Sequence, residues 1–100
     1  MTVRHLITIR VAPGRVPDFV KAFEALQRSA SQEEGCEQYD LFRSFDDPDK
    51  VVILERWTSR ELLEKHMEAE RTTNDSLVQA LVALWEPGTA PTVERFEEAD

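Results

Sequence analysis

Residues 36–57 decide the fold: CEQYDLFRSF occupies positions 36–45, DDPDK follows at 46–50, and VVILERW completes the stretch at 51–57. The first and last of these segments are rich in the aromatic and β-branched residues that favour strands. Between them, Pro48 presets the backbone angle φ for a type I turn, and the aspartates beside it can accept hydrogen bonds from the turn backbone. The stretch therefore predicts two antiparallel strands that are joined as a hairpin.

Upstream of the hairpin, the spacing of the apolar residues first fits a strand and then fits a helix. Residues 3–11 alternate in a way that gives the predicted strand one strongly apolar face. After a break at residues 12–14, apolar side chains recur at helical spacing over 16–26. We expect this helix to fade over residues 31–34 and to stop at Gly35, because glycine readily adopts the left-handed conformation that ends a helix.

Downstream of the hairpin, the sequence predicts two more helical segments and a last strand. A capping box at residues 58–61 opens a helix that continues through about Glu70. Residues 72–74 offer N-caps for a further helix, which ends before the Pro-Gly pair at 87–88. Residues 91–96 then form a short final strand, so the predicted order is β-α-β-β-α-(α)-β.

This order is the split βαβ pattern of the ferredoxin-like fold, an α+β fold in which helices cover one face of a four-stranded antiparallel sheet. Right-handed crossovers would place the first and third strands side by side. We expect one domain over residues 1–100, with a frayed acidic tail from about residue 97. Because the strands carry apolar residues on both faces, a homodimer that packs two sheets face to face into an α+β barrel is the economical arrangement. The alternative is a monomer whose second face is partly wetted.

The composition is typical of a globular protein and argues against several functions. Apolar residues make up 41% of the chain and charged residues 32%, and no apolar run approaches the roughly 18 residues that span a bilayer. The start of the chain lacks the features of a signal peptide, so we expect a cytoplasmic protein that does not enter membranes. The net charge of -8 predicts that nucleic acid is not a partner. One cysteine and two histidines are too few for a disulfide or a typical zinc site, so no metal is expected.

Several short motifs follow one another in an order that points to a family. They are GCEQYDLFRS at residues 35–44, Asp-Pro at 47–48, VILERW at 52–57, Ser59 and His66. Together they fit a G-x-x-x-Y-x-L-x-x-S, D-P, E-x-W, H pattern, which closely resembles the antibiotic-biosynthesis-monooxygenase family over nearly the whole chain. The resemblance implies a homodimer with an apolar cavity between sheet and helices in each subunit. It also implies an activity, because some members oxidise polycyclic aromatic or quinol substrates with molecular oxygen and without flavin, haem or metal.

Oxygenation without a cofactor needs a base, a donor for the developing oxyanion and a dry pocket. We expect His66 to be the catalytic base, since imidazole titrates near neutral pH and its spacing from Leu62 directs it to the covered side of its helix. A half-buried histidine bonded to a backbone carbonyl is the structural alternative. Trp57 could form a cavity wall or donate its indole N–H to the substrate, although packing in the core is the competing interpretation.

Four further residues are candidate substrate ligands, each with a structural alternative. Tyr39 could donate to a bound oxyanion or serve only in packing, and Asn74 could reach the pocket mouth or cap a helix. His5 could face the pocket or pack in the dimer interface. Arg56 alternates with Glu55 along the third strand, so only one of the two can face the helices. For Glu55 we expect a cross-strand or intersubunit ion pair.

The leading hypothesis is a cofactor-independent monooxygenase that acts on a small aromatic, anthrone-like or quinol substrate with molecular oxygen. One alternative is an isomerase or epimerase of the same fold. Another is a dimeric ligand-binding or stress-associated module without catalysis. A cavity into which His66 faces favours the enzyme, whereas an interior filled by side chains favours the module.

Overall fold

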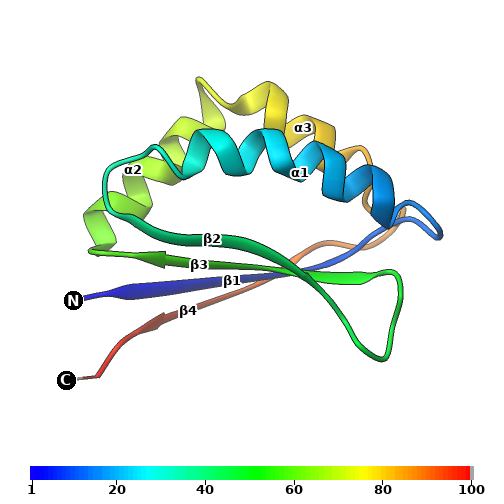
Figure 1. The fold of residues 1–100 in the computed structure, drawn as a ribbon, viewed down its shortest axis with the longest axis horizontal. Coiled ribbons are helices and arrows are strands. Elements are labelled where there is room, and N and C mark those ends of the chain that lie inside the picture. Colours follow the sequence, from blue (N-terminus) through cyan, green and yellow to red (C-terminus); the bar gives the residue numbers. More distant parts are fainter. Residues whose placement is uncertain (100) are drawn as a thin grey trace.

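The computed structural model describes residues 1–99, and its elements follow the predicted order. They are β1 (Val3–Arg10), α1 (Val16–Ala30), β2 (Cys36–Arg43), β3 (Lys50–Trp57), α2 (Arg60–Arg71), α3 (Asp75–Val82) and β4 (Thr92–Glu97). The strands form one antiparallel sheet in the order β2-β3-β1-β4, so the first and third strands lie side by side as expected. All three helices lie on the same face of this sheet (Figure 1). The fold is therefore the ferredoxin-like α+β fold that the sequence predicts.

Three helix boundaries differ from the prediction, one of them at the end of α3, which stops at Val82 and not just before the Pro-Gly pair. Helix α1 ends at Ala30, and Gly35, with φ of 84°, lies in the turn just before β2 instead of ending the helix. A Cβ atom on Gly35 would lie 2.5 Å from Leu62 Cδ1, so glycine is required there for space as well as for conformation. Ser59, not Thr58, caps α2, because its hydroxyl accepts the backbone N–H of Leu62. The Thr58 backbone N–H instead donates to the Gly35 carbonyl, which keeps Thr58 beside β2.

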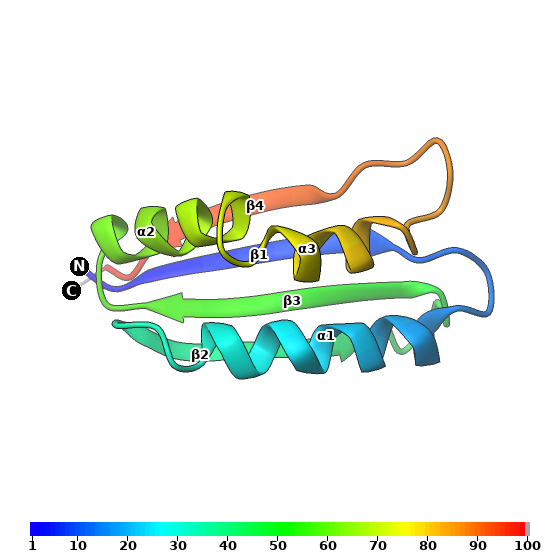
Figure 2. The ribbon, with the colours of Figure 1, turned by 90° about the horizontal axis from the view of Figure 1, so that it is seen from above.

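The covered face of the sheet holds the core. In Figure 2, α1 follows the β2 edge, while α2 and α3 lie over the half of the sheet that contains β1 and β4. Alternate residues of β1 and β3 point toward these helices, where they are buried together with the inner side of α1. The largest fully buried side chains are Trp57, Phe19, Leu26, His66, Glu55, Val11 and Val51. Two members of that set are ionisable, which is unusual for the centre of so small a core.

The opposite face of the sheet, which we call the open face, is left without a helix (Figure 1). Phe42 and Phe96 are about half exposed there, at 48% and 52%. Glu98 was expected to lie in a frayed tail, but its backbone N–H bonds to the Thr2 carbonyl and its carboxylate pairs with Arg4 and Arg56. Of the expected tail, Asp100 lies outside the described residues. None of the helices described is long and apolar enough to cross a membrane.

Candidate active site

A buried histidine surrounded by carboxylates lies between α2 and the sheet. His66 on α2 is fully buried, and its Nδ1 lies 3.1 Å from both carboxylate oxygens of Glu33. Its Nε2 lies 3.5 Å from Glu70 Oε2 and 3.6 Å from Glu55 Oε1, which is ion-pair distance without a well-formed hydrogen bond. We call these four residues the His66 cluster.

The carboxylates decide the protonation state of His66. Burial by itself lowers the pKa of the imidazole, because it disfavours the charged form, but Glu70, Glu55 and Glu33 outweigh it and raise the pKa to about 9. His66 is therefore an imidazolium at neutral pH. The cluster is a buried cation held among anions, and each charge depends on the others for its solvation.

Aromatic side chains enclose the His66 cluster. The Trp57 ring stacks on the imidazole with 4.5 Å between ring centroids, and its indole N–H donates to Glu55 Oε1 at 2.8 Å. Tyr39 meets the imidazole edge-on, and its hydroxyl lies 3.5 Å from Glu70 Oε2. Burial, aided by the nearby carboxylates, raises the pKa of Tyr39 and keeps the phenol neutral. Both aromatic residues thus use their polar atoms inside the protein.

A second buried histidine lies on the other side of the Glu55 carboxylate. His5 on β1 is 4% exposed and stands opposite Glu55 in the pairing of β1 with β3. Its Nδ1 lies 3.2 Å from Glu55 Oε2, although the two groups are not aligned as a hydrogen bond. Its Nε2 has no hydrogen-bond partner among residues 1–99. The single carboxylate of Glu55 therefore lies between two imidazoles.

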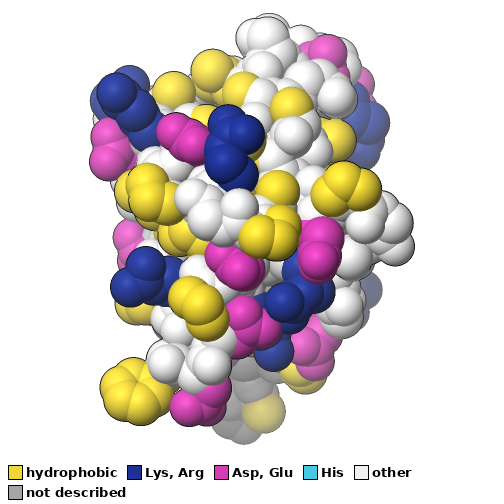
Figure 3. Space-filling model, turned by 90° about the vertical axis from the view of Figure 1, so that its right-hand side faces the viewer, with side chains coloured by type: hydrophobic (Ala, Val, Ile, Leu, Met, Phe, Trp, Pro, Cys, Tyr) yellow, Lys and Arg dark blue, Asp and Glu magenta, His cyan; other side chains and the backbone are white. Residues whose placement is uncertain are grey.

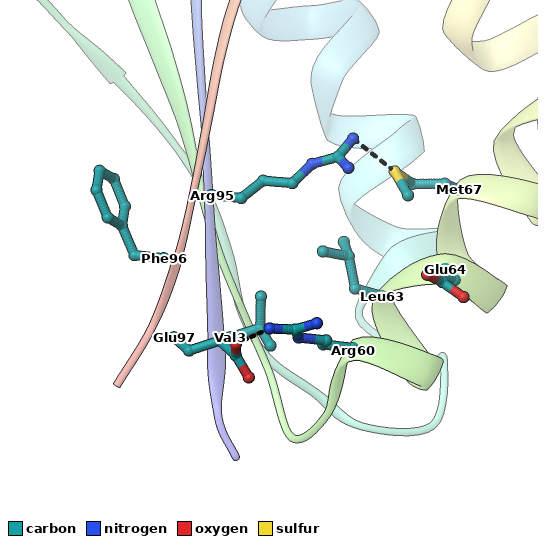
Figure 4. A pocket seen from close by; sticks show the side chains of 8 residues that line it. All are labelled: Val3, Arg60, Leu63, Glu64, Met67, Arg95, Phe96 and Glu97. Carbon is teal, nitrogen blue, oxygen red and sulfur yellow. Dashed lines mark hydrogen bonds and ion pairs between the residues drawn. The ribbon is translucent and has the colours of Figure 1, made fainter. Parts of the chain in front are cut away.

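A cleft of about 270 Å³ opens between α2 and β4. Its walls are Val3, Arg60, Leu63, Glu64, Met67, Arg95, Phe96 and Glu97. Figure 4 shows Arg95 reaching from β4 toward α2, where its guanidinium lies 3.4 Å from Met67 Sδ. Arg60 and Glu97 form an ion pair between the same two elements, with Val3 and Leu63 between these two contacts. We call this space the α2–β4 cleft.

His5 is not a wall of this cleft, but it is a close neighbour of two residues that are. It follows Val3 by two residues on the same face of β1, and Arg95 stands opposite it in the pairing of β1 with β4. The cleft therefore adjoins His5, whereas neither His66 nor Trp57 lines it. His66 instead borders a separate hollow of about 230 Å³ beside Glu33 and Lys65.

Two predicted site residues lie elsewhere. Arg56 faces the open side of the sheet, where its guanidinium binds Glu98 at 3.0 Å, so it is not a wall of the cleft. Asn74 occupies the N-cap position of α3, as the alternative interpretation predicted, although its side chain makes no capping bond. Its Oδ1 accepts the Ser29 hydroxyl at 3.1 Å, which ties α1 to the start of α3.

The three carboxylates of the His66 cluster were not among the predicted site residues. Glu70 follows His66 by four positions, a spacing that places both on one helix face and could have revealed it. Glu55 shares the alternation of residues 51–57 that buries Trp57, so the sequence pattern also indicated that Glu55 is buried if Trp57 is buried. Glu33 lies in the turn after α1, and no periodic pattern marks it.

The surface adds little to the list of candidate ligands. In the part of the chain that the structure covers, no group of three or more His, Cys, Asp or Glu side chains is placed to hold a metal ion. On the end of the molecule in Figure 3, basic side chains lie beside acidic ones and do not gather into one patch.

Burial, followed by the charges of Glu55 and Glu33, raises the pKa of the half-buried Cys36 to about 11, which keeps this thiol protonated.

The fold and this site define a class: a small ferredoxin-like α+β protein with a ligand-sized cleft beside buried ionisable groups. The family model for antibiotic biosynthesis monooxygenase matches residues 2–74. The chain belongs to that family, which the sequence motifs had indicated.

Individual relatives agree with this assignment at different levels. "Putative monooxygenase YcnE" of Bacillus subtilis strain 168 is 32% identical over 60 residues, which are 60% of this chain and 63% of that protein. A conserved protein from Methanosarcina mazei superposes with a TM-score of 0.86 at 18% identity, covering 99% of this chain and 94% of the other. A Nitrosomonas europaea protein named after the same family gives a TM-score of 0.85 at 15% identity, covering 97% and 89%. At such identities the two structures support the fold alone.

Proposed function

We propose that the chain is a cofactor-independent monooxygenase that oxidises a small aromatic or quinol substrate with molecular oxygen in the α2–β4 cleft. The observation that carries the proposal is the position of this cleft, which adjoins buried ionisable groups in a member of a monooxygenase family. Buried acid-base groups beside a pocket are a feature that active sites share.

The walls of the cleft favour a small, flat and partly polar substrate. Val3, Leu63 and Met67 offer apolar surface, while two arginines and two glutamates, among them the Arg60–Glu97 ion pair, make the walls partly polar. The volume of about 270 Å³ is near the lower end of the range for small-molecule pockets, roughly 300–1,000 Å³. A compact quinol therefore fits better than a large polycyclic compound.

The proposed reaction balances without an added reductant. One atom of molecular oxygen enters the quinol ring, and the other leaves as water together with two hydrogens from the substrate. The product is a hydroxyquinone, and the substrate supplies all the electrons. The protein must then bind the substrate, accept a proton and exclude water, which are tasks for side chains alone.

His66 has a positioning role in this proposal. Its pKa of about 9 makes it a cation at neutral pH, and a group that is already protonated is a poor base. As a cation it can hold Glu55 in place, with Trp57 donating to the same carboxylate. The catalytic role predicted for His66 from the sequence stays a prediction, which oxygen uptake by the His66→Gln variant tests.

We also propose the homodimer through the open face. Leu6, Leu54, Phe42 and Phe96 share that face, and half-exposed aromatic side chains on an uncovered sheet favour a second copy over water. Sedimentation equilibrium at micromolar concentration measures it, and a mass equal to one chain would contradict the proposal.

A non-catalytic binding module is the second candidate. One observation favours it: His66 and Trp57 are fully buried by side chains and do not line the α2–β4 cleft. Such a module would bind a ring compound in the cleft without consuming oxygen.

An oxygen electrode separates the two candidates. Chelator-treated protein is mixed with 1,4-naphthohydroquinone, anthrone and catechol, and oxygen uptake is compared with protein-free autoxidation. The enzyme predicts faster uptake, incorporation of one labelled oxygen atom into the product, and loss of uptake when Leu63→Phe fills the cleft. Arg28→Met, an exposed change on α1, is the matched control, and His66→Gln reports the contribution of that residue. Uptake at the protein-free rate with all three compounds would contradict the proposed function.

A further inference from the structure

We infer that His5, oriented by Glu55, is the proton acceptor of the α2–β4 cleft, and that Arg95 binds the oxyanion which the transfer creates. The ligand class that follows is a ring compound with an ionisable hydroxyl group. The inference rests on the proposed function for its place in oxygenation, but the acid-base site can be tested by binding alone.

Neither ring nitrogen of His5 makes a hydrogen bond within residues 1–99, but Nδ1 lies at ion-pair distance from Glu55 while Nε2 has no such neighbour. A carboxylate beside Nδ1 favours the tautomer with its proton on that nitrogen, so Nε2 carries the lone pair that can accept a proton. Glu55 Oε2 lies 3.2 Å from His5 Nδ1, on the adjacent strand.

The free nitrogen of His5 is the observation that points to a ligand. His5 is 96% buried, and its Nε2 has no partner among residues 1–99. Buried polar atoms nearly always have partners, because a desolvated group without a hydrogen bond is costly. A hydroxyl group that enters from the cleft would supply the missing partner.

Arg95 is placed to hold the negative charge that results. Its guanidinium contacts the Met67 thioether, a weak acceptor, and none of the described carboxylates lies within ion-pair distance of it. Arg60, at the other end of the cleft, is by contrast paired with Glu97. In a chain with 20 acidic and 12 basic residues, a cleft arginine that has no carboxylate partner within residues 1–99 is suited to bind an anion.

The strand register brings the two groups together. Arg95 stands opposite His5 on the neighbouring strand, and both belong to the covered face. The Arg95 side chain is exposed and extends toward α2 (Figure 4). In this proposal the ligand displaces the weak thioether contact and approaches His5 from the cleft. The charged groups facing His5 are then Glu55 on β3 and Arg95 on β4, with the His66 imidazolium of α2 beyond Glu55.

The chemical step is a proton transfer. The substrate O–H bond breaks, its proton passes to His5 Nε2, and the bonding pair stays on the oxygen, which faces the Arg95 guanidinium. No oxidant takes part in this step. The electron-rich phenolate that results is the form of a quinol that reacts with oxygen in the proposed function.

The test uses 4-nitrophenol as the probe, because its phenolate is yellow and can be followed by absorbance without oxygen chemistry. At a fixed pH below the pKa of the free probe, wild-type protein should increase the phenolate fraction on binding. His5→Gln keeps a polar side chain beside Glu55 but removes the basic nitrogen, so the bound probe should stay neutral. Arg95→Met should weaken binding about tenfold or more, since it removes a charged hydrogen-bond donor. Arg28→Met should behave as the wild type.

The outcomes separate this inference from the proposed function. If the probe ionises in a His5-dependent way and no quinol consumes oxygen, the acid-base site stands and the monooxygenase proposal fails. If oxygen uptake is present and His5→Gln leaves it unchanged, the inference is overturned, because loss of a general base should lower the rate about 100-fold or more. Binding and ionisation that survive Arg95→Met also overturn it. If His5→Gln does not fold, the binding and ionisation of 4-nitrophenol by Arg95→Met still test the inference, because Arg95 is exposed and its replacement should not affect folding.

Discussion

The two histidines of this protein lie on either side of one carboxylate and differ in almost every other respect. His66 is surrounded by Glu33, Glu55 and Glu70, stacks on Trp57 and is protonated at neutral pH. His5 has Glu55 as its one carboxylate at ion-pair distance within residues 1–99, and its buried Nε2 has no partner there. Similar burial therefore says little about role, whereas the number of partners distinguishes a histidine that stabilises the fold from one that is free to react.

Glu55 is what makes the two histidines interdependent. Its Oε1 accepts from Trp57 and faces His66, while its Oε2 faces His5. The His66 side fixes the position of the carboxylate, and the His5 side can then use it to orient an imidazole. If this division holds, changes to the His66 side should act mainly on stability, and changes to His5 mainly on ligand chemistry.

Replacing His66 should have the largest effect. His66→Leu leaves Glu33, Glu55 and Glu70 without their cation, and breaking a buried ion pair from one side costs about 3–5 kcal/mol. The free energy of unfolding, measured in urea at pH 7, should fall by that amount. Lys65→Gln, on an exposed position of the same helix, is the matched control. A loss no larger than that of His5→Gln would remove the distinction between the two histidines.

The pH dependence of the free energy of unfolding should also show that the His66 imidazolium stabilises the fold. Because the pKa of His66 is about 9 in the folded protein and 6.5 in the unfolded chain, its contribution is complete below pH 6.5 and disappears as the pH rises through 9. The expected decline between those limits is about 3 kcal/mol. Urea unfolding over this pH range measures it, with His66→Gln as the variant in which the decline should vanish. A wild-type profile that is flat from pH 6.5 to 9 would show that the imidazole is not held as a cation.

The alternation of residues along β1 and β3 was sufficient to predict which side chains share a face, but not which of Glu55 and Arg56 turns inward. It placed His5 with Ile7 and Ile9, and it left only one of Glu55 and Arg56 able to face the helices. What it could not give was the partner of each polar group. Glu33 reaches His66 from a turn 33 positions away, and such a contact depends on how helices pack and not on local spacing.

The cleft was harder to predict than the fold for a related reason. Its shape depends on how far α2 stands from β4, and the side chains that bridge the gap, Arg95 and Arg60, look like ordinary surface arginines in the sequence. Arg95 does share the alternation of Val93 and Glu97, which assigns it to the covered face. Nothing in that pattern indicates that its guanidinium would meet a thioether in place of a carboxylate.

The hydrogen bond from Trp57 to Glu55 offers the finest test of the comparison. Trp57→Phe keeps most of the aromatic packing against His66 but removes the N–H that donates to Glu55 Oε1 at 2.8 Å. A buried acceptor that loses its donor costs about 1–3 kcal/mol, so urea unfolding should detect a smaller loss than that of His66→Leu. Repeating the change in a Glu55→Gln background should reduce the loss, because no buried charge then depends on the indole. Equal losses in the two backgrounds would mean that Trp57 acts through its volume alone, and that Glu55 is held for His5 by the imidazolium of His66 without help from the indole.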